Sequence, residues 1–147
     1  MPLKLELQVA SSEQELPEQA EFQQWLNTCF PDIKGSVLVR IVDAEESAEL
    51  NQHYRQKEGP TNVLSFPFDL PDEIENDHLG DLVLCAPVIR REASEQGKSV
   101  MHHWSHMLIH GVLHLLGYDH LNDEEAEEME GIEVGLLSRL AVSNPYL

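Results

Sequence analysis

Basic residues are scarce in this chain. Of its 147 residues, 9 are lysine or arginine and 27 are aspartate or glutamate, which gives a formal net charge of −18 at pH 7. A field of this sign repels nucleic acids and anionic membranes at long range, so a polyanionic substrate has to be held by local cations or by a metal. Seven of the acids lie between Asp123 and Glu133, and we expect them to form a solvated helix face.

Cysteines and long apolar runs are also scarce. Cys29 and Cys85 form neither a disulfide framework nor a Cys-x-x-Cys metal clip, so we expect buried, reduced thiols. Residues 1–10 lack the basic start and apolar run of a signal peptide. No stretch approaches the roughly 18 apolar residues of a membrane span. We therefore expect a cytoplasmic protein with no membrane partner.

The length and patterning predict one α+β domain over residues 1–147. A chain of this size buries one core comfortably, and no repeat or low-complexity linker divides it. Alternating or continuous apolar residues predict strands at 3–9, 37–42, 61–68 and 79–86. Helical spacing and capping signals predict helices at 17–30, 43–58, 87–96, 99–116 and 122–140. The expected architecture is one mixed β-sheet of about four strands with helices packed on it.

Three histidines have a spacing that suits a metal ion. His110 and His114 are four residues apart, so on a helix they share one face about one turn apart. Gly117 can adopt a left-handed conformation that ends the helix and returns His120 toward the pair. Three imidazoles with one open position are typical of a catalytic zinc site, although imidazole also binds nickel, copper and iron. The sequence therefore predicts zinc on this central helix and the following turn.

Other polar side chains have weaker claims to the metal. The drift of about 40° per four residues takes His102 off the ligand face, and we expect His103 and His106 to lie in the core or behind the ligands. Asp119 is the alternative third ligand, or an acceptor for an imidazole N–H. Asp81 interrupts an apolar strand and needs a partner if it is buried, either an arginine or a ligand histidine.

The histidine motif lacks a residue that a peptidase would need. His-x-x-x-His-x-x-Gly-x-x-His is the spacing of the metzincin proteases, which carry a glutamate base directly after the first histidine. That position is Gly111 here, and glycine cannot take a proton. A zinc peptidase is therefore disfavoured, and no side chain in the motif is an evident general base.

Several motifs together closely resemble the YbeY family, over nearly the whole chain and most strongly from Leu50 to Glu130. They are HGVLHLLGYDH at 110–120, Tyr54-Arg55, PTNVLSFPF at 60–68, LGDLVLC at 79–85 and Gly97-Lys98. The resemblance implies a zinc-dependent, single-strand-specific endoribonuclease that matures the 3′ end of the small-subunit 16S rRNA and takes part in ribosome quality control. Its metal ligands fall on His110, His114 and His120, and its functional arginine falls on Arg55.

The resemblance implies single-stranded rRNA as a partner, and the acidity of the chain suggests that the ribosome or its small-subunit proteins deliver that RNA. Arg55 suits this chemistry, because its planar guanidinium matches a phosphate and stays protonated. We expect Arg55 and His114 to be catalytic, while either a metal-activated water or the ribose 2′-hydroxyl attacks. The alternative to an enzyme is an assembly factor whose metal only braces the fold.

The polar and aromatic side chains of residues 61–68 have two possible roles each. Thr61, Asn62 and Ser65 either line a groove or satisfy backbone groups. Phe66 and Phe68 share one strand face, where we expect core packing, with base stacking as the alternative.

Overall fold

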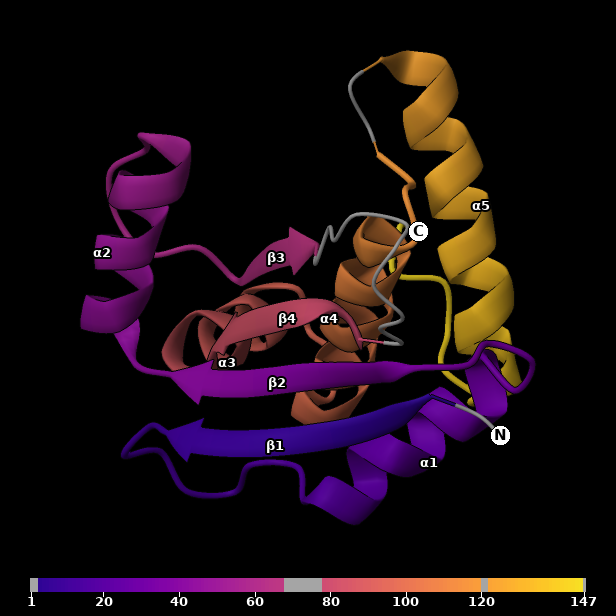
Figure 1. Ribbon diagram of the computed structural model, residues 1–147, viewed down its shortest axis with the longest axis horizontal. Coiled ribbons are helices and arrows are strands. Elements are labelled where there is room, and N and C mark those ends of the chain that lie inside the picture. Colours follow the sequence, from indigo (N-terminus) through magenta and orange to yellow (C-terminus); the bar gives the residue numbers. More distant parts are fainter. Residues whose placement is uncertain (1–2, 68–77, 120–121, 147) are drawn as a thin grey trace, which may run out of the picture.

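The computed structural model describes residues 3–67, 78–119 and 122–146. Its elements follow the predicted order of strands and helices (Figure 1): β1 Lys4–Ala10, α1 Gln19–Cys29, β2 Ser36–Val42, α2 Ala44–Arg55, β3 Val63–Pro67, β4 His78–Cys85, α3 Ala86–Glu95, α4 Val100–Leu115 and α5 Asp123–Arg139. Phe68 lies outside the described residues. Among the described residues, no helix has the length and apolar composition needed to cross a membrane.

The four strands form one mixed sheet in the order β1-β2-β4-β3. The β1–β2 and β2–β4 pairs are parallel, and β3 runs antiparallel to β4 with Val63 opposite Leu84 and Pro67 opposite Gly80. Pro67 therefore lies at the end of an edge strand, as its missing N–H predicts. The predicted α+β fold with a mixed four-stranded sheet is confirmed.

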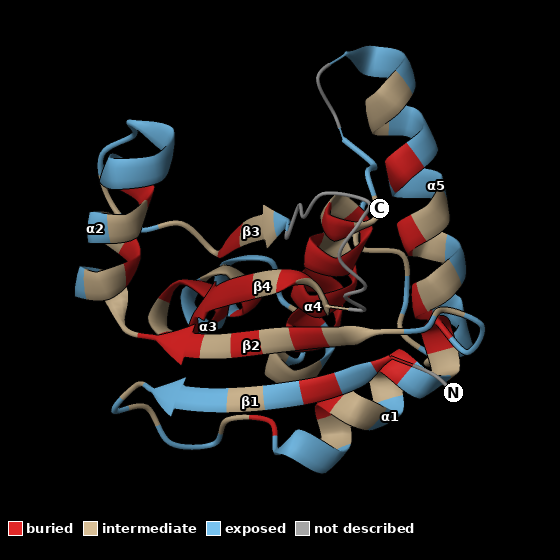
Figure 2. Ribbon diagram, viewed as in Figure 1, coloured by how far each residue is buried: buried red, intermediate tan, exposed pale blue. Residues whose placement is uncertain are grey.

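Helix α4 packs on one face of the sheet against β3 and β4, α1 packs on β1, and α5 packs on α4 and α1. Figure 2 shows α4 as almost wholly buried, with Leu108, Ile109 and Val112 at 0% exposure. They pack with Leu82 of β4 and with the apolar sides of α1 and α5. Each such fully buried side chain contributes roughly 1.5–3 kcal/mol, so α4 is held firmly against the sheet.

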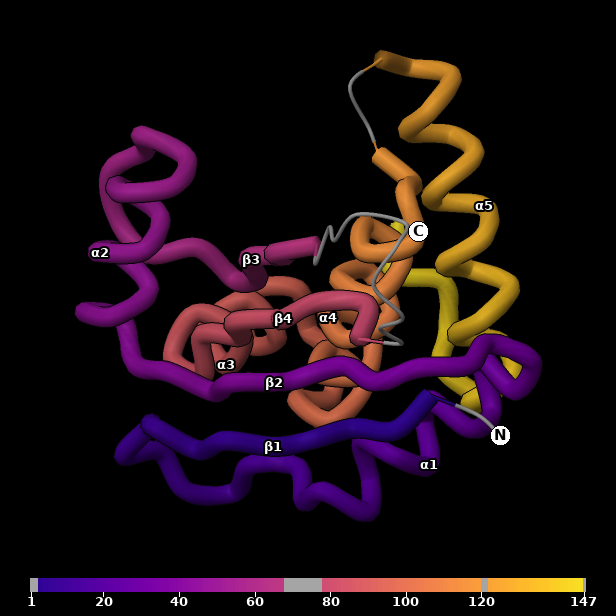
Figure 3. The backbone as a smooth tube through the Cα atoms, viewed as in Figure 1, coloured from indigo at the N-terminus to yellow at the C-terminus, as the bar shows by residue number. Residues whose placement is uncertain are grey.

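The other face carries a smaller apolar cluster near the ends of β2, β3 and β4. Its buried members are Val42, Leu64, Val83, Cys85 and Val88, with Leu50 of α2 and Phe66 of β3 packed against them. This cluster anchors α2 beside the edge strand. In the trace of Figure 3, α2 and α5 stand on the two sides of β3.

Both ends of α2 differ from what the sequence predicts, which is an N-cap at Asp43 with Glu46 completing a capping box. Asp43 precedes the helix without a side-chain cap, because its carboxylate accepts hydrogen bonds from the hydroxyls of Ser11 and Ser12 instead. Glu46 does not complete a capping box, because it pairs with Arg40 at 2.6 Å. The helix also ends at Arg55 rather than at the predicted residue 58.

Gln56 produces that early end. It adopts a left-handed conformation with φ 55°, and its N–H donates to the carbonyls of Asn51 and Gln52. Such a residue closes the last turn of a helix. Arg55 is consequently the last residue of the helix.

Both cysteines are buried and free, as predicted. Burial raises the pKa of the Cys29 thiol to about 11, and nearby Arg139 offsets this in part. Burial likewise raises the pKa of Cys85. Both thiols are protonated packing groups at neutral pH.

Candidate metal centre and cleft

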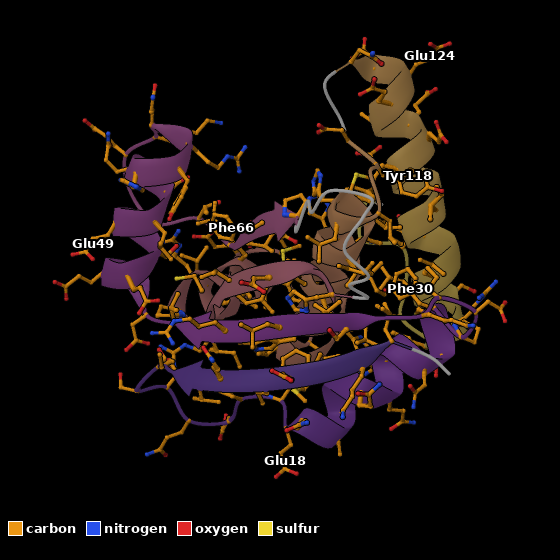
Figure 4. The ribbon with its side chains drawn as sticks, viewed as in Figure 1. Glu18, Phe30, Glu49, Phe66, Tyr118 and Glu124 are labelled. Carbon is orange, nitrogen blue, oxygen red and sulfur yellow. The ribbon has the colours of Figure 1, made fainter. Side chains whose placement is uncertain are left out.

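A cleft of about 750 Å³ opens beside the edge strand. It is lined by Tyr54 and Arg55 of α2, by residues 61–67, by His110 and His114 of α4, and by residues 117–119. Figure 4 shows Phe66 on the side toward α2 and Tyr118 on the side toward α5. The cleft therefore collects the predicted functional arginine and two of the three predicted metal ligands.

The two histidines of α4 converge in this cleft. Their Nε2 atoms lie 3.1 Å apart, which is close to the spacing of about 3.3 Å between two nitrogens bound to one tetrahedral zinc ion. Gly117 has a φ of +102°, so it turns the chain in the left-handed conformation that the motif requires. The donor chemistry and this convergence fit a metal ion.

The third predicted ligand, His120, lies outside the described residues, so its role stays a prediction. Within residues 3–67, 78–119 and 122–146, no group of three or more His, Cys, Asp or Glu side chains is arranged to hold a metal ion. The described part of the chain thus supplies two converging imidazoles. Asp119, the alternative ligand, lines the same cleft.

Glu133 of α5 lies directly behind His110. Its carboxylate is fully buried and accepts hydrogen bonds from Nδ1 of His110, from Nε2 of His106 at 3.0 Å and from the hydroxyl of Tyr146. Because an ionised carboxylate only accepts, Nδ1 of His110 carries its hydrogen. Nε2 of a neutral His110 then presents a lone pair, as a metal ligand requires.

The charge of Glu133 is stabilised by the same contacts. Burial raises the pKa of this carboxyl group, but the hydrogen bonds from His106, His110 and Tyr146 outweigh that effect and hold the pKa at about 2. Burial lowers the pKa of His106, which the contact with Glu133 partly offsets. Burial and the neighbouring carboxylate raise the pKa of Tyr146, so its hydroxyl stays a donor.

Glu133 is the residue that sequence reasoning missed. The sequence predicts a solvated face for the acids of 123–133, and for Glu133 this prediction is wrong because its side chain is buried. The available signal was its position: Met129, Glu133 and Leu137 are spaced by four and all are buried. An acid in line with an apolar stripe indicates a buried partner rather than solvent.

The remaining polar predictions have distinct outcomes. His102 is exposed, whereas His103 is buried and pairs through Nε2 with Glu92 at 2.9 Å. Asp81 is not buried, since its side chain is 48% exposed, and it contacts His78 of its own strand at 2.8 Å. Among the described residues it contacts no arginine and neither His110 nor His114, because the pleat of β4 turns it away from α4.

Gly111 is explained by the packing of α4 on the sheet. A Cβ at this position would lie 2.8 Å from Cδ2 of Leu82 and 3.3 Å from Cγ2 of Val63. A side chain here would collide with the strands, so a glutamate base has no room. This geometry adds a steric reason to the chemical one against a peptidase of the metzincin type.

Arg55 stands at the opposite wall of the cleft. The ion pairs of three other arginines are Arg40–Glu46, Arg90–Glu13 and Arg91–Glu95, whereas Arg55 forms no such pair with any residue that the structure describes. Its side chain is exposed and lines the cleft opposite the histidines. The cleft therefore has both a cationic side chain and two imidazoles in its lining.

Comparisons with known proteins agree with this architecture. Residues 6–141 match the family model described as Endoribonuclease YbeY. The chain belongs to the YbeY family. The protein named Endoribonuclease YbeY of Methylococcus capsulatus is 54% identical over 144 residues, covering 98% of this chain and 95% of its own length. The protein of that name in Colwellia psychrerythraea is 48% identical over 149 residues, covering 97% and 96%.

A solved structure shares the fold. The solution structure of TM1509 from Thermotoga maritima matches with a TM-score of 0.65 and 25% sequence identity, over 92% of this chain and 89% of that one. YbeY family membership makes the chain a hydrolase that acts on RNA.

Proposed function

We propose that this chain is a zinc-dependent, single-strand-specific endoribonuclease that matures the 3′ end of 16S rRNA and serves ribosome quality control in the cytoplasm. The observation that carries the proposal is the cleft itself. Two imidazole Nε2 atoms converge to 3.1 Å on one wall, and Arg55 lines the other. A metal-binding wall facing a guanidinium is an arrangement suited to a phosphodiester.

His110, His114 and His120 are the residues that would hold the zinc ion. Held there, zinc would supply Lewis-acid chemistry: it would lower the pKa of a bound water and polarise a phosphoryl oxygen. Glu133 keeps His110 in the tautomer that ligation needs and fixes its ring, through the hydrogen bond from Nδ1. His106 and Tyr146 hold Glu133 in turn.

Arg55 would bind the phosphate and stabilise the charge that develops on it. Its guanidinium is exposed to the cleft and is not paired with a described carboxylate, so no ion pair with a described residue has to break before substrate binds. Among the described residues that line the cleft, it is also the only lysine or arginine. In a chain with a net charge of −18, this local cation offsets long-range repulsion at the place where the phosphate lies.

Comparison of the wild type with Arg55→Ala tests the proposal. Both proteins, purified by one scheme, should carry equal zinc by elemental analysis. Cleavage of a single-stranded RNA should fall about 100-fold or more in the variant, because a charge-stabilising donor is lost. Arg91→Ala is the matched control, since Arg91 is an exposed arginine of α3 with a long, 3.9 Å contact to Glu95.

Equal cleavage by all three proteins would show that a contaminating nuclease is responsible and would favour the non-catalytic assembly factor. The chemistry of the product ends adds a second distinction. A 3′-hydroxyl product rules out attack by the ribose 2′-hydroxyl, whereas a cyclic phosphate supports it.

We also propose that the ribosome or small-subunit ribosomal proteins bring the RNA to this acidic chain. Binding to free RNA should then be weak, and added salt should weaken it further. Tight binding of naked RNA at high salt, measured by filter retention, would contradict delivery by a partner.

A further inference from the structure

The α2 wall of the cleft carries an aromatic ring, that of Tyr54, to which the proposed function gives no role. Tyr54 precedes Arg55 on the last turn of α2 and keeps 59% of its surface exposed, yet it lines the cleft. A tyrosine ring presents a large apolar surface. A ligand that covers this ring would remove that surface from water, which is favourable.

The ring of Tyr54 is held in place by two neighbours. Its centroid lies 5.1 Å from that of Phe66 with the planes at 73°, and 4.6 Å from that of His53 with the planes at 87°. Both are edge-to-face arrangements, the geometry that aromatic pairs favour. Phe66 in turn packs on the apolar cluster of β2, β3 and β4, so Tyr54 is supported from the core.

Tyr54 and Arg55 are consecutive, so their Cα atoms are about 3.8 Å apart. The side chains of consecutive helical residues point in different directions, but both of these line one cleft, so its wall offers a flat ring and a planar cation. A nucleotide of a single strand has the matching pair of groups, a base and a phosphate. Aromatic stacking of bases supplies affinity that does not depend on attracting polyanions at long range, which suits a chain of net charge −18.

We propose that Tyr54, supported by Phe66, is a stacking subsite for the base of the nucleotide whose phosphate Arg55 binds. This subsite rests on the proposed endoribonuclease function and refines it. It requires a base that is splayed out of any duplex, which gives a physical source for single-strand specificity. Every base has a π-face, so the subsite tolerates any sequence.

Abasic substitution of the RNA tests the subsite directly. A single-stranded RNA with one cleavage site is prepared as a series in which each nucleotide in turn lacks its base. For the wild type, we expect one abasic position beside the cleaved bond to lower kcat/KM about tenfold or more. Tyr54→Leu should lower kcat/KM similarly on the intact RNA and should be indifferent to base removal at that position.

Two kinds of control accompany Tyr54→Leu. Tyr54→Phe and Tyr54→Trp keep a ring and should retain both the rate and the sensitivity to the abasic position. Gln52→Leu changes another exposed residue of α2 that does not line the cleft and should behave as the wild type. The proposal is overturned if no position is sensitive, or if Tyr54→Leu keeps the wild-type pattern.

A binding measurement separates this proposal from the proposed function. Tyr54→Trp places an indole in the cleft, and titration with a 2′-deoxy oligonucleotide should quench its emission. The wild type is the control, because Trp104 is 1% exposed and Trp25 packs on the same main core. Quenching without RNA cleavage would refute the nuclease proposal and keep the stacking subsite. RNA cleavage with no quenching of the indole and no sensitivity to an abasic position would refute the stacking subsite and leave the nuclease proposal standing.

Discussion

Two histidines of α4 each donate a hydrogen bond to a glutamate of a neighbouring helix, His103 to Glu92 and His110 to Glu133. The two pairs differ in the surroundings of the other ring nitrogen of each histidine. His103 donates from Nε2 to Glu92 at 2.9 Å, and its buried Nδ1 has no hydrogen-bond partner among the described residues. His110 donates from Nδ1 to Glu133, and its Nε2 lies 3.1 Å from that of His114 in the cleft.

A buried carboxylate–imidazole pair is therefore not by itself a functional site. The Glu92 pair is completed by the side-chain amide of Asn62 at 3.2 Å and ties α3 to α4 and to the start of β3. The Glu133 pair ties α5 to α4 and also leaves Nε2 of His110 in the cleft beside Nε2 of His114. We therefore propose that the first pair stabilises the fold and that the second positions a metal ligand.

The largest expected contrast is between the two histidines. His110→Ala should abolish stoichiometric zinc and reduce RNA cleavage to background, because a ligand is lost. His103→Ala should keep its zinc and lose about 1–3 kcal/mol of unfolding free energy, since Glu92 loses a hydrogen-bond partner. Elemental analysis and denaturant unfolding of both proteins measure this. Loss of zinc from His103→Ala would contradict the different roles proposed for the two histidines.

A subtler contrast uses the two glutamates. Glu133→Gln should weaken zinc binding about 10- to 100-fold, the usual effect of removing a carboxylate behind a ligand histidine. Glu92→Gln, an isosteric change in the other pair, should leave zinc affinity unchanged. Competition with a chromophoric chelator measures both. Equal affinity for zinc in the two variants would mean that Glu133 only packs.

The smallest effect concerns pH. Burial raises the pKa of Glu92, but hydrogen bonds from His103 and Asn62 outweigh it, so the pKa lies below its ordinary value of 4.5. A carboxyl group whose pKa is lowered by folding stabilises the folded state above pH 4.5. This stabilisation is lost as the pH falls through the pKa of the folded state. The stability difference between wild type and Glu92→Gln should therefore shrink from about pH 6 to about pH 3. A constant difference across this range would contradict the assignment.

Much of this arrangement could be predicted from sequence because it depends on local spacing. The separation of His110 and His114 predicts one helix face, and Gly117 predicts the turn that follows. Pro67 predicts the edge of the sheet. Each of these features is settled by residues within a few positions of one another.

The features that sequence reasoning missed depend on contacts between distant segments. Glu133 reaches His110 across 23 positions, and its burial follows from how α5 rotates onto α4. Asp43 loses its capping role to Ser11 and Ser12, more than 30 residues earlier. Asp81 keeps solvent contact because it lies on the face of the sheet away from α4, and the sequence of β4 alone does not indicate which of its two faces α4 covers.

Titration of zinc into the metal-depleted chain, with cleavage of single-stranded RNA as the readout, tests the central claim most directly. If His110, His114 and His120 hold the working metal, cleavage should rise in proportion to added zinc and stop rising at one ion per chain, and His110→Ala should show no such rise. Cleavage that is independent of zinc, or identical in His110→Ala, would contradict a zinc-dependent ribonuclease.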